Sequence, residues 1–212
     1  MYKIIEIFDI LEVKNYVDGL KAIIFDMDDT LYGEKEYVRS GYKQIAKLLP
    51  QVKNAEEKLW KLFEAKKPAI DELLIQEGVH SEEIKQECLK IYRYQIPDIH
   101  LYAGVKELLR ELKGQGFLLG IITDGRPEGQ RAKIKALDLE GMVDHIIVTD
   151  ELGGAEFRKP NPLAFQKMKE ELDVEYSQMC YIGDNIKKDF VAPQQLGMRS
   201  IWFKNPDGLY VR

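Results

Sequence analysis

The sequence contains few of the residues that build disulfide frameworks and zinc sites. Its 212 residues include two cysteines and three histidines. Cys88 and Cys180 lie far apart along the chain, and neither has further ligands at close spacing. A disulfide framework or a structural zinc site needs more such residues, close together. We therefore interpret both cysteines as reduced, structural thiols.

Long apolar runs are missing as well. No stretch approaches the ~18 apolar residues that a membrane-spanning helix requires. Residues 1–11 are partly apolar, but they carry Glu6 and Asp9 and lack the small-residue cleavage site of a signal peptide. We therefore expect no membrane association and, by default, a cytoplasmic location.

The chain has no excess of basic residues. It contains 31 Lys and Arg against 36 Asp and Glu, which gives a formal net charge of −5. A dedicated nucleic-acid-binding protein would present a basic face, so we expect no nucleic-acid partner. A small anionic substrate is still compatible with this balance, because a local pocket can be positive on an acidic protein.

An alternation of apolar runs and amphipathic segments predicts the fold. Short runs rich in Ile, Val and Leu indicate strands, and the segments between them show helical spacing. The predicted strands are residues 23–25, 117–123, 145–149, 179–183 and 199–203, and the predicted helices are 105–112, 127–137, 162–172 and 189–196. Such alternation is typical of α/β proteins, so we predict a doubly wound parallel sheet formed by residues 20–32 and 98–212.

Residues 33–97 differ in character from the sheet segments. They are rich in Glu, Lys, Leu and Ile, and their apolar residues recur at helical spacing between Pro50, Pro68 and Gly78. We therefore predict an all-helical domain that is inserted directly after the first strand.

Residues 1–19 precede the first predicted strand and have two interpretations. Helical spacing connects the apolar residues Ile4, Ile7, Phe8 and Leu11, but residues 3–8 are also compatible with a strand. We expect this lead-in to pack on the sheet domain, with contact to another chain or domain as the alternative.

Three carboxylates directly follow the first predicted strand. Asp26, Asp28 and Asp29 lie within four residues, at the end of a short apolar run. Open α/β sheets place their ligands at the carboxyl ends of strands. Adjacent anions repel one another, and a divalent cation would offset this repulsion. Two interpretations stay open at this point: a metal site with a carboxylate nucleophile, or an acidic turn.

A hydroxyl and a glycine turn follow the next strand of the predicted sheet. Thr123, Asp124 and Gly125 combine the hydroxyl with backbone N–H groups that open a helix, which is an arrangement suited to an anion. The pattern is weak by itself, because many strands end in a threonine and a turn.

Two more polar clusters lie in the second half of the chain. Lys159 could offset negative charge between a phosphate and carboxylates, although it also fits an ordinary loop lysine. Asp184 ends a predicted strand and could complete an oxygen-ligand shell for Mg²⁺. Asp189 lies five residues further on, where it also fits a helix N-cap.

In motif and order, these clusters resemble the haloacid dehalogenase-like (HAD) superfamily. The chain carries Asp-x-Asp-x-Thr at 26–30, Thr-Asp-Gly at 123–125, Lys-Pro at 159–160 and Gly-Asp-x₄-Asp at 183–189. The helical insert is similar to that superfamily's type 1 cap, and the resemblance covers residues from about 20 to 204. Many members have Asn after the threonine, where this chain has Asp124; this variant should leave the role of Thr123 untouched.

The resemblance implies a role for each matching residue. Asp26 would attack phosphorus and form an aspartyl-phosphate, and Asp28 would protonate the leaving alcohol and then deprotonate the hydrolytic water. Mg²⁺ would be held by Asp26, the Asp28 carbonyl and Asp184. Phosphate would be bound by Thr123, Asp124, Gly125 and Lys159, with Asn185 and Asp189 as supporting residues. Dehalogenases lack an Asp at the place of Asp28, so its presence favours phosphate esters. Asp29 receives no role.

The cap of this superfamily closes over the site and selects the substrate. The loop that carries Asp26–Thr30 is called the nucleophile loop. We expect substrate contacts from polar residues that follow it in the sequence, namely Tyr32, Glu34, Tyr37, Arg39 and Tyr42. Tyr and Arg suit a polar, hydroxyl-bearing or anionic leaving group. Tyr37 fits the apolar core of the cap equally well.

The resemblance implies an enzyme with a small phosphorylated metabolite as its partner. We expect a Mg²⁺-dependent phosphatase acting on a phosphomonoester such as a sugar phosphate or a nucleotide. A phosphomutase would share every motif and use the cap to exclude water. A phospho-ligand-binding or assembly domain of a larger enzyme is a third interpretation, left open by the lead-in.

Overall fold

The computed structural model describes residues 3–209, and the chain forms two compact units. The core unit comprises Met1–Glu34 and His100–Arg212, and the helical unit comprises Lys35–Ile99. The predicted insert, residues 33–97, differs from the helical unit by two residues at each end. The outermost residues of the predicted lead-in and core, 1–2 and 210–212, lie outside the described residues.

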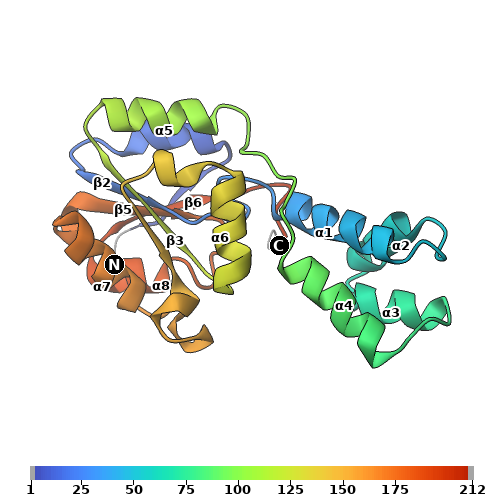
Figure 1. Ribbon diagram of the computed structural model, residues 1–212. Coiled ribbons are helices and arrows are strands. Elements are labelled where there is room, and N and C mark those ends of the chain that lie inside the picture. Colours follow the sequence, from blue (N-terminus) through green and yellow to red (C-terminus); the bar gives the residue numbers. More distant parts are fainter. Residues whose placement is uncertain (1–2, 210–212) are drawn as a thin grey trace. The chain divides into compact units, whose positions relative to one another are not determined.

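A six-stranded parallel sheet forms the centre of the core unit (Figure 1). Its strands are β1 (Ile5–Ile7), β2 (Ala22–Phe25), β3 (Leu118–Thr123), β4 (His145–Val148), β5 (Met179–Gly183) and β6 (Arg199–Phe203). They are arranged in the order β1-β6-β5-β2-β3-β4, and every neighbouring pair is parallel. The central strand β2 is buried along its whole length, as expected for a strand covered on both faces. The predicted doubly wound parallel sheet is confirmed.

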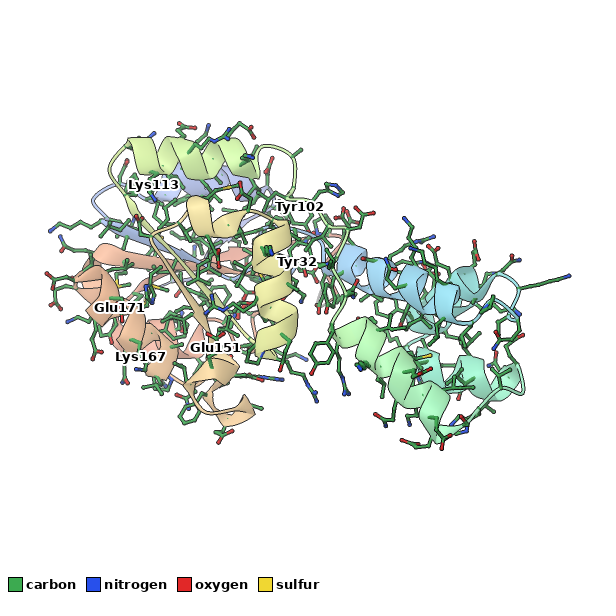
Figure 2. All side chains as sticks on the ribbon, in the orientation of Figure 1. Tyr32, Tyr102, Lys113, Glu151, Lys167 and Glu171 are labelled. Atoms are coloured by element: carbon green, nitrogen blue, oxygen red, sulfur yellow. The ribbon has the colours of Figure 1, made fainter. Side chains whose placement is uncertain are left out.

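Helices cover both faces of the sheet. The helices that lead into β3, β4, β5 and β6 are α5 (Val105–Gly114), α6 (Pro127–Ala136), α7 (Leu163–Leu172) and α8 (Val191–Leu196). Figure 1 shows α5 on one side of the sheet and α7 and α8 on the other. On α7, Phe165 and Met168 are buried against the sheet, whereas Lys167 and Glu171 point outward (Figure 2). Within residues 3–209, no helix combines the length and apolarity needed to cross a membrane.

The lead-in contributes a strand and a short helix to the core unit. β1 pairs with β6 at the edge of the sheet, and the 3-10 helix η1 (Ile10–Tyr16) contacts α5. Asp9 caps η1 through a hydrogen bond from the Leu11 N–H. The strand interpretation therefore holds for the first part of the segment, and Phe8, which the helical pattern had placed on an apolar face, is 67% exposed.

Four helices make up the helical unit. They are α1 (Glu34–Leu48), whose first residue belongs to the core unit, α2 (Ala55–Glu64), α3 (Ala69–Gln76) and α4 (Glu82–Arg93). Their apolar faces share one buried cluster that includes Ile45, Leu59, Leu74 and Cys88. The unit therefore has a hydrophobic core of its own, which agrees with its identification as a separate compact body.

The strand order places a crevice beside β2. From β2 the chain moves outward through β3 and β4, and then returns to the other side of β2 with β5 and β6. In open α/β sheets, such a reversal leaves space at the carboxyl ends of the strands. The residues that follow β2, β3 and β5 therefore meet at one place.

Candidate active site

A cavity of about 440 Å³ lies at this edge of the core unit. It is lined by Asp26, Asp28, Glu34, Asp124, Arg158, Lys159, Asp184, Asn185 and Lys188. The structure thus brings together residues from all four predicted clusters, which are far apart in the sequence. Arg158 and Lys188 were not among the predicted site residues.

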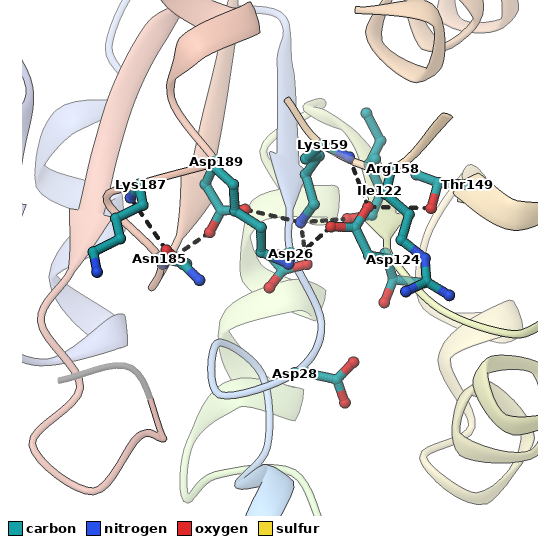
Figure 3. Close-up of polar contacts among 12 residues, drawn as sticks. Asp26, Asp28, Ile122, Asp124, Thr149, Arg158, Lys159, Asn185, Lys187 and Asp189 are labelled. Carbon is teal, nitrogen blue, oxygen red and sulfur yellow. Dashed lines mark hydrogen bonds and ion pairs between the residues drawn. The ribbon is translucent and has the colours of Figure 1, made fainter. Parts of the chain in front are cut away.

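Lys159 lies at the centre of the site, with its side chain fully buried (Figure 3). Its Nζ is 2.6 Å from Asp26 Oδ1 and 3.0 Å from Asp189 Oδ1, and it contacts the Tyr181 hydroxyl at 2.8 Å. Burial opposes the charged form, but the two carboxylates prevail and hold the pKa of Lys159 well above its usual value. The lysine therefore stays cationic between Asp26 and Asp189.

Carboxylates outnumber cations around Asp26. Single oxygens of Asp26, Asp184 and Asp189 lie within 4.8 Å of one another. Burial raises the pKa of Asp26 to about 7, and burial together with the Asp26 charge raises the pKa of Asp184 to about 9. Burial, and after it the repulsion between carboxylates, thus disfavours the ionised form of both groups, which a bound cation would favour, and an all-oxygen donor set suits Mg²⁺. The residues present therefore fit the divalent cation that the sequence led us to expect.

Both oxygens of Asp189 face protein groups: Oδ1 faces a cation without a hydrogen bond, and Oδ2 accepts a hydrogen bond. Oδ1 pairs with Lys159, and Oδ2 accepts a hydrogen bond from the Asn185 N–H at 2.9 Å. Asp26 and Asp184 are therefore better suited to hold a metal, and Asp189 to hold Lys159 in place.

Asp28 is held by three donors from the same unit. Lys133 Nζ lies 2.7 Å from Oδ1, Gln130 Nε2 donates to Oδ2 at 2.8 Å, and the Tyr32 hydroxyl donates to Oδ1. Burial works to raise the pKa of Asp28, but the Lys133 charge and the hydrogen bonds outweigh it and lower this pKa below its usual value. Asp28 is therefore ionised.

Gln130 and Lys133 are functional candidates that the sequence analysis missed. A signal for them exists, because Gln130, Lys133, Ile134 and Leu137 have the i, i+3, i+4, i+7 spacing of a buried helix face. All four are buried in the structure. Two polar residues on such a face indicate buried polar partners, since a buried polar group without one is costly. The partners themselves, Asp28 and Thr123, become visible only in three dimensions.

Asp124 anchors the neighbouring loops. Its Oδ1 accepts hydrogen bonds from the Lys159 N–H at 3.0 Å and the Thr149 hydroxyl at 3.1 Å, and its Oδ2 pairs with Lys188 at 2.8 Å. Burial opposes ionisation, but Lys159 and Lys188 outweigh it and lower the pKa of Asp124. Phosphate binding by Asp124 stays a prediction; its ionised carboxylate would repel a phosphate dianion, which leaves its backbone N–H as the group suited to that role.

The predicted substrate contacts of the insert fall into different environments. Tyr37 and Tyr42 are 7% and 6% exposed, and both pack inside the helical unit against Tyr92. This packing agrees with the alternative given for Tyr37, a place in the apolar core of the insert; substrate contact by either residue stays a prediction. Arg39 stacks on Trp60, 4.7 Å from the ring centroid. It also pairs with Glu56 at the helical unit's surface.

Tyr32 and Glu34 belong to the core unit and lie beside the nucleophile loop. Tyr32 is fully buried, and its hydroxyl donates to Asp28, a catalytic candidate; its substrate contact stays a prediction. Glu34 lines the cavity, where burial and the Asp28 charge raise its pKa to about 8. Asp29 supports the loop by accepting hydrogen bonds from the Glu34 and Leu209 N–H groups.

Gly183 leaves room for Asp189. A Cβ at this position would lie 2.5 Å from Asp189 Oδ2, and a separation this short requires a shift. We expect Gly183→Ala to displace Asp189 from Lys159 and to lower the free energy of unfolding by about 1–3 kcal/mol. Gly114, at the end of α5, has open space around its Cβ direction, so Gly114→Ala should be neutral or stabilising by up to about 1 kcal/mol. Urea unfolding of both variants checks this contrast, and equal stabilities would contradict it.

The parallel sheet, the crevice beside β2 and the carboxylate–lysine cluster define an α/β protein with a HAD-like core. The family model described as haloacid dehalogenase-like hydrolase matches residues 23–203. The chain belongs to this family, and the resemblance inferred from its motifs is confirmed.

Relatives with known names share parts of the chain. The glyceraldehyde 3-phosphate phosphatase of Pyrococcus furiosus is 34% identical over 101 residues, which is 48% of this chain and only 41% of that protein. The Methanocaldococcus jannaschii protein of the same name is 26% identical over 200 residues, covering 86% of this chain and 84% of that protein. A HAD-superfamily hydrolase from Geobacter sulfurreducens has the same fold, with a TM-score of 0.67 at 18% identity over 89% of each chain.

Proposed function

We propose that this protein is a Mg²⁺-dependent phosphatase that hydrolyses a small phosphomonoester through an aspartyl-phosphate at Asp26. The observation that carries the proposal is the position of Asp26: it lines the cavity, and one of its oxygens pairs with Lys159 at 2.6 Å. A carboxylate held this way has one oxygen oriented by a cation and the other available for attack.

The first step forms the covalent intermediate. An oxygen of Asp26 bonds to phosphorus while the bond between phosphorus and the leaving oxygen breaks, and Asp28 gives its proton to that oxygen. Asp28 is ionised in the structure, but a bound phosphate dianion next to it favours the protonated form, since like charges raise a carboxyl pKa. Lys159 stays cationic and offsets charge on the phosphoryl group and on Asp26.

The second step releases phosphate. Asp28, now ionised, takes a proton from water as the water oxygen bonds to phosphorus, and the bond between phosphorus and Asp26 breaks. Thr123 ends β3 beside the cavity residues and would bind a phosphoryl oxygen through its hydroxyl, which accepts a hydrogen bond from Gln130 at 2.6 Å. The backbone N–H of Gly125 would add a second donor.

Asp26, Asp184 and the Asp28 carbonyl would hold Mg²⁺, which when bound polarises a phosphoryl oxygen and offsets its charge. Protons compete with the cation, because these carboxyls bind it in the ionised form. Their pKa values of about 7 and about 9 imply weak binding at low pH and stronger binding as the pH rises through that range.

We therefore expect millimolar MgCl₂ to raise the melting temperature more at about pH 9 than at about pH 6. Without metal, the raised pKa values have the opposite effect: the folded state binds more protons than the unfolded state, so stability falls as the pH rises. Differential scanning fluorimetry, with NaCl at matched ionic strength as the reference, measures the Mg²⁺-specific shift in melting temperature. Asp184→Asn should remove most of this shift. A shift that is equal at both pH values, or unchanged in Asp184→Asn, contradicts the assignment.

We also propose that the helical unit serves as the cap that selects the leaving group. The support is its position in the sequence, directly after the nucleophile loop, together with its separate core. The phosphatase names of the relatives favour a small, three-carbon or similar phosphorylated metabolite as substrate.

A phosphate-release screen tests the proposed function. The purified protein with Mg²⁺ is assayed against triose phosphates, 2-phosphoglycolate, hexose phosphates and nucleotides, and release of inorganic phosphate from at least one small phosphomonoester is expected. An isomerised sugar phosphate without free phosphate would show a phosphomutase. No turnover of any substrate would favour a phospho-ligand-binding or assembly role.

A further inference from the structure

Tyr32, Gln130 and Lys133 all donate to the Asp28 carboxylate, and we call these three residues the clamp. None of them belongs to the sequence motifs from which the other roles were derived. We infer that Lys133 is a positioning residue, which together with Gln130 and Tyr32 fixes the Asp28 carboxyl group for proton transfer to the leaving alcohol and from water. The inference rests on the proposed phosphatase function. It adds Lys133, on α6, as a residue that supports the proton transfer by Asp28.

Burying the Lys133 ammonium group would destabilise the folded protein if no partner compensated its charge. The Lys133 side chain is 5% exposed, and a buried ammonium group destabilises a protein unless a charged partner compensates it. Asp28, 2.7 Å away, is such a partner. The ammonium group also lies 6.0 Å from the centroid of the Tyr32 ring, whose hydroxyl donates to the same carboxylate oxygen. Lys133 is therefore directed at the nucleophile loop, unlike the exposed Lys135 on the same helix.

The donors occupy the two oxygens of Asp28 unequally. A carboxylate offers about four acceptor positions, two on each oxygen. Oδ1 receives both Lys133 and the Tyr32 hydroxyl, whereas Oδ2 receives the amide of Gln130. One position on Oδ2 remains for the proton that is transferred. The clamp thus fixes the plane of the carboxyl group and assigns the proton to the oxygen without a cation.

Gln130 connects this carboxyl group to the phosphate-binding residue. Its Nε2 lies 2.8 Å from Asp28 Oδ2 and 2.6 Å from Thr123 Oγ1. Gly125 makes room for the glutamine, because a Cβ there would lie 3.1 Å from Gln130 Cγ and Cδ. One helix therefore sets the distance between the proton-transfer group and the phosphoryl-binding hydroxyl, and such positioning contributes strongly to catalysis.

The dependence on the leaving group distinguishes positioning from a merely structural role. A nitrophenolate departs without a proton, whereas an alkoxide needs one. For Lys133→Met we expect kcat/KM to fall roughly 10- to 100-fold with an alkyl phosphate such as glycerol phosphate. With p-nitrophenyl phosphate, kcat/KM should change less than about threefold, since it reports only steps through release of the leaving group. The water step is shared, so kcat should fall for both substrates. Lys135→Met is the matched control and should leave both substrates unchanged, and Lys133→Arg should restore part of the loss.

The outcomes separate this inference from the proposed function. Suppose that the wild-type protein hydrolyses both esters. The positioning role is then overturned if Lys133→Met lowers kcat/KM by the same factor for both esters, or lowers it for neither of them. If the wild-type protein releases phosphate from neither ester, the proposed function fails instead. Tyr32→Phe removes only one hydroxyl from the clamp and should show the same split at smaller size. If thermal unfolding shows that Lys133→Met does not fold, Tyr32→Phe provides the same test.

Discussion

Asp26→Asn should reduce phosphate release by a factor on the order of 10⁴ or more while the protein still folds. An amide oxygen is a much weaker nucleophile than a carboxylate, so the covalent step is lost. Folding should survive, because Lys159 keeps its ion pair with Asp189 and the repulsion within the buried cluster decreases. Asn has almost the same volume as Asp, so the packing at the end of β2 changes little.

Steady-state phosphate release and circular dichroism together measure this effect. Asp173→Asn is the matched control, because Asp173 is exposed at the end of α7 in a left-handed conformation that Asn tolerates. The control should keep full activity. Substantial turnover by Asp26→Asn, after mass spectrometry has excluded reversion to Asp, would remove Asp26 as the nucleophile.

Lys159→Met should be the most destabilising single change in the site. Removing the ammonium group leaves Asp26 and Asp189 buried and without their shared cation. Breaking a buried ion pair from one side costs about 3–5 kcal/mol in the free energy of unfolding. Activity should fall as well, because phosphoryl transfer depends on charge neutralisation at this point. Urea unfolding in the presence of EDTA measures the stability without help from a bound cation.

The stability loss in Lys159→Met should also depend on pH in a definite direction. Lys159 opposes the effect of burial on Asp26, so without it the pKa of Asp26 in the folded state rises further and the folded protein binds more protons than the unfolded chain. The loss of stability should therefore be smaller near pH 5 than near pH 8. Lys169→Met, which breaks the exposed pair with Glu175, is the control and should cost at most about 1 kcal/mol. A loss of similar size in the two variants would contradict the central position of Lys159.

The strands around the site could be predicted because their sequence signal is local. Runs such as Ile23–Phe25 and Met179–Gly183 are buried on both faces, and a continuous apolar run is the direct consequence of that burial. Since the carboxyl ends of parallel strands share one edge, the cavity residues after β2, β3 and β5 could be expected to meet. Their roles in turnover stay predictions, which the experiments above test.

Other features depend on contacts that no local pattern encodes. Tyr37 and Tyr42 have an amphipathic side chain that suits a substrate and a helical core equally well, and only the tertiary fold shows that both rings pack against Tyr92. Lys133 and Gln130 are separated from Asp28 by about a hundred residues, so their contacts follow from the tertiary fold alone. The lead-in shows helical spacing and yet forms an edge strand, because β6 offers an unpaired edge at that side of the sheet.

Direct capture of the covalent intermediate tests the proposed mechanism most sharply. The protein is quenched during turnover of a small phosphomonoester and treated with borohydride, which reduces an acyl phosphate to a primary alcohol. Peptide mass spectrometry should then find homoserine in place of Asp26, in wild-type protein incubated with substrate and Mg²⁺ and not in the protein incubated without substrate. Reduction at another carboxylate, or phosphate release with no reduced residue at any position, would contradict an aspartyl-phosphate at Asp26.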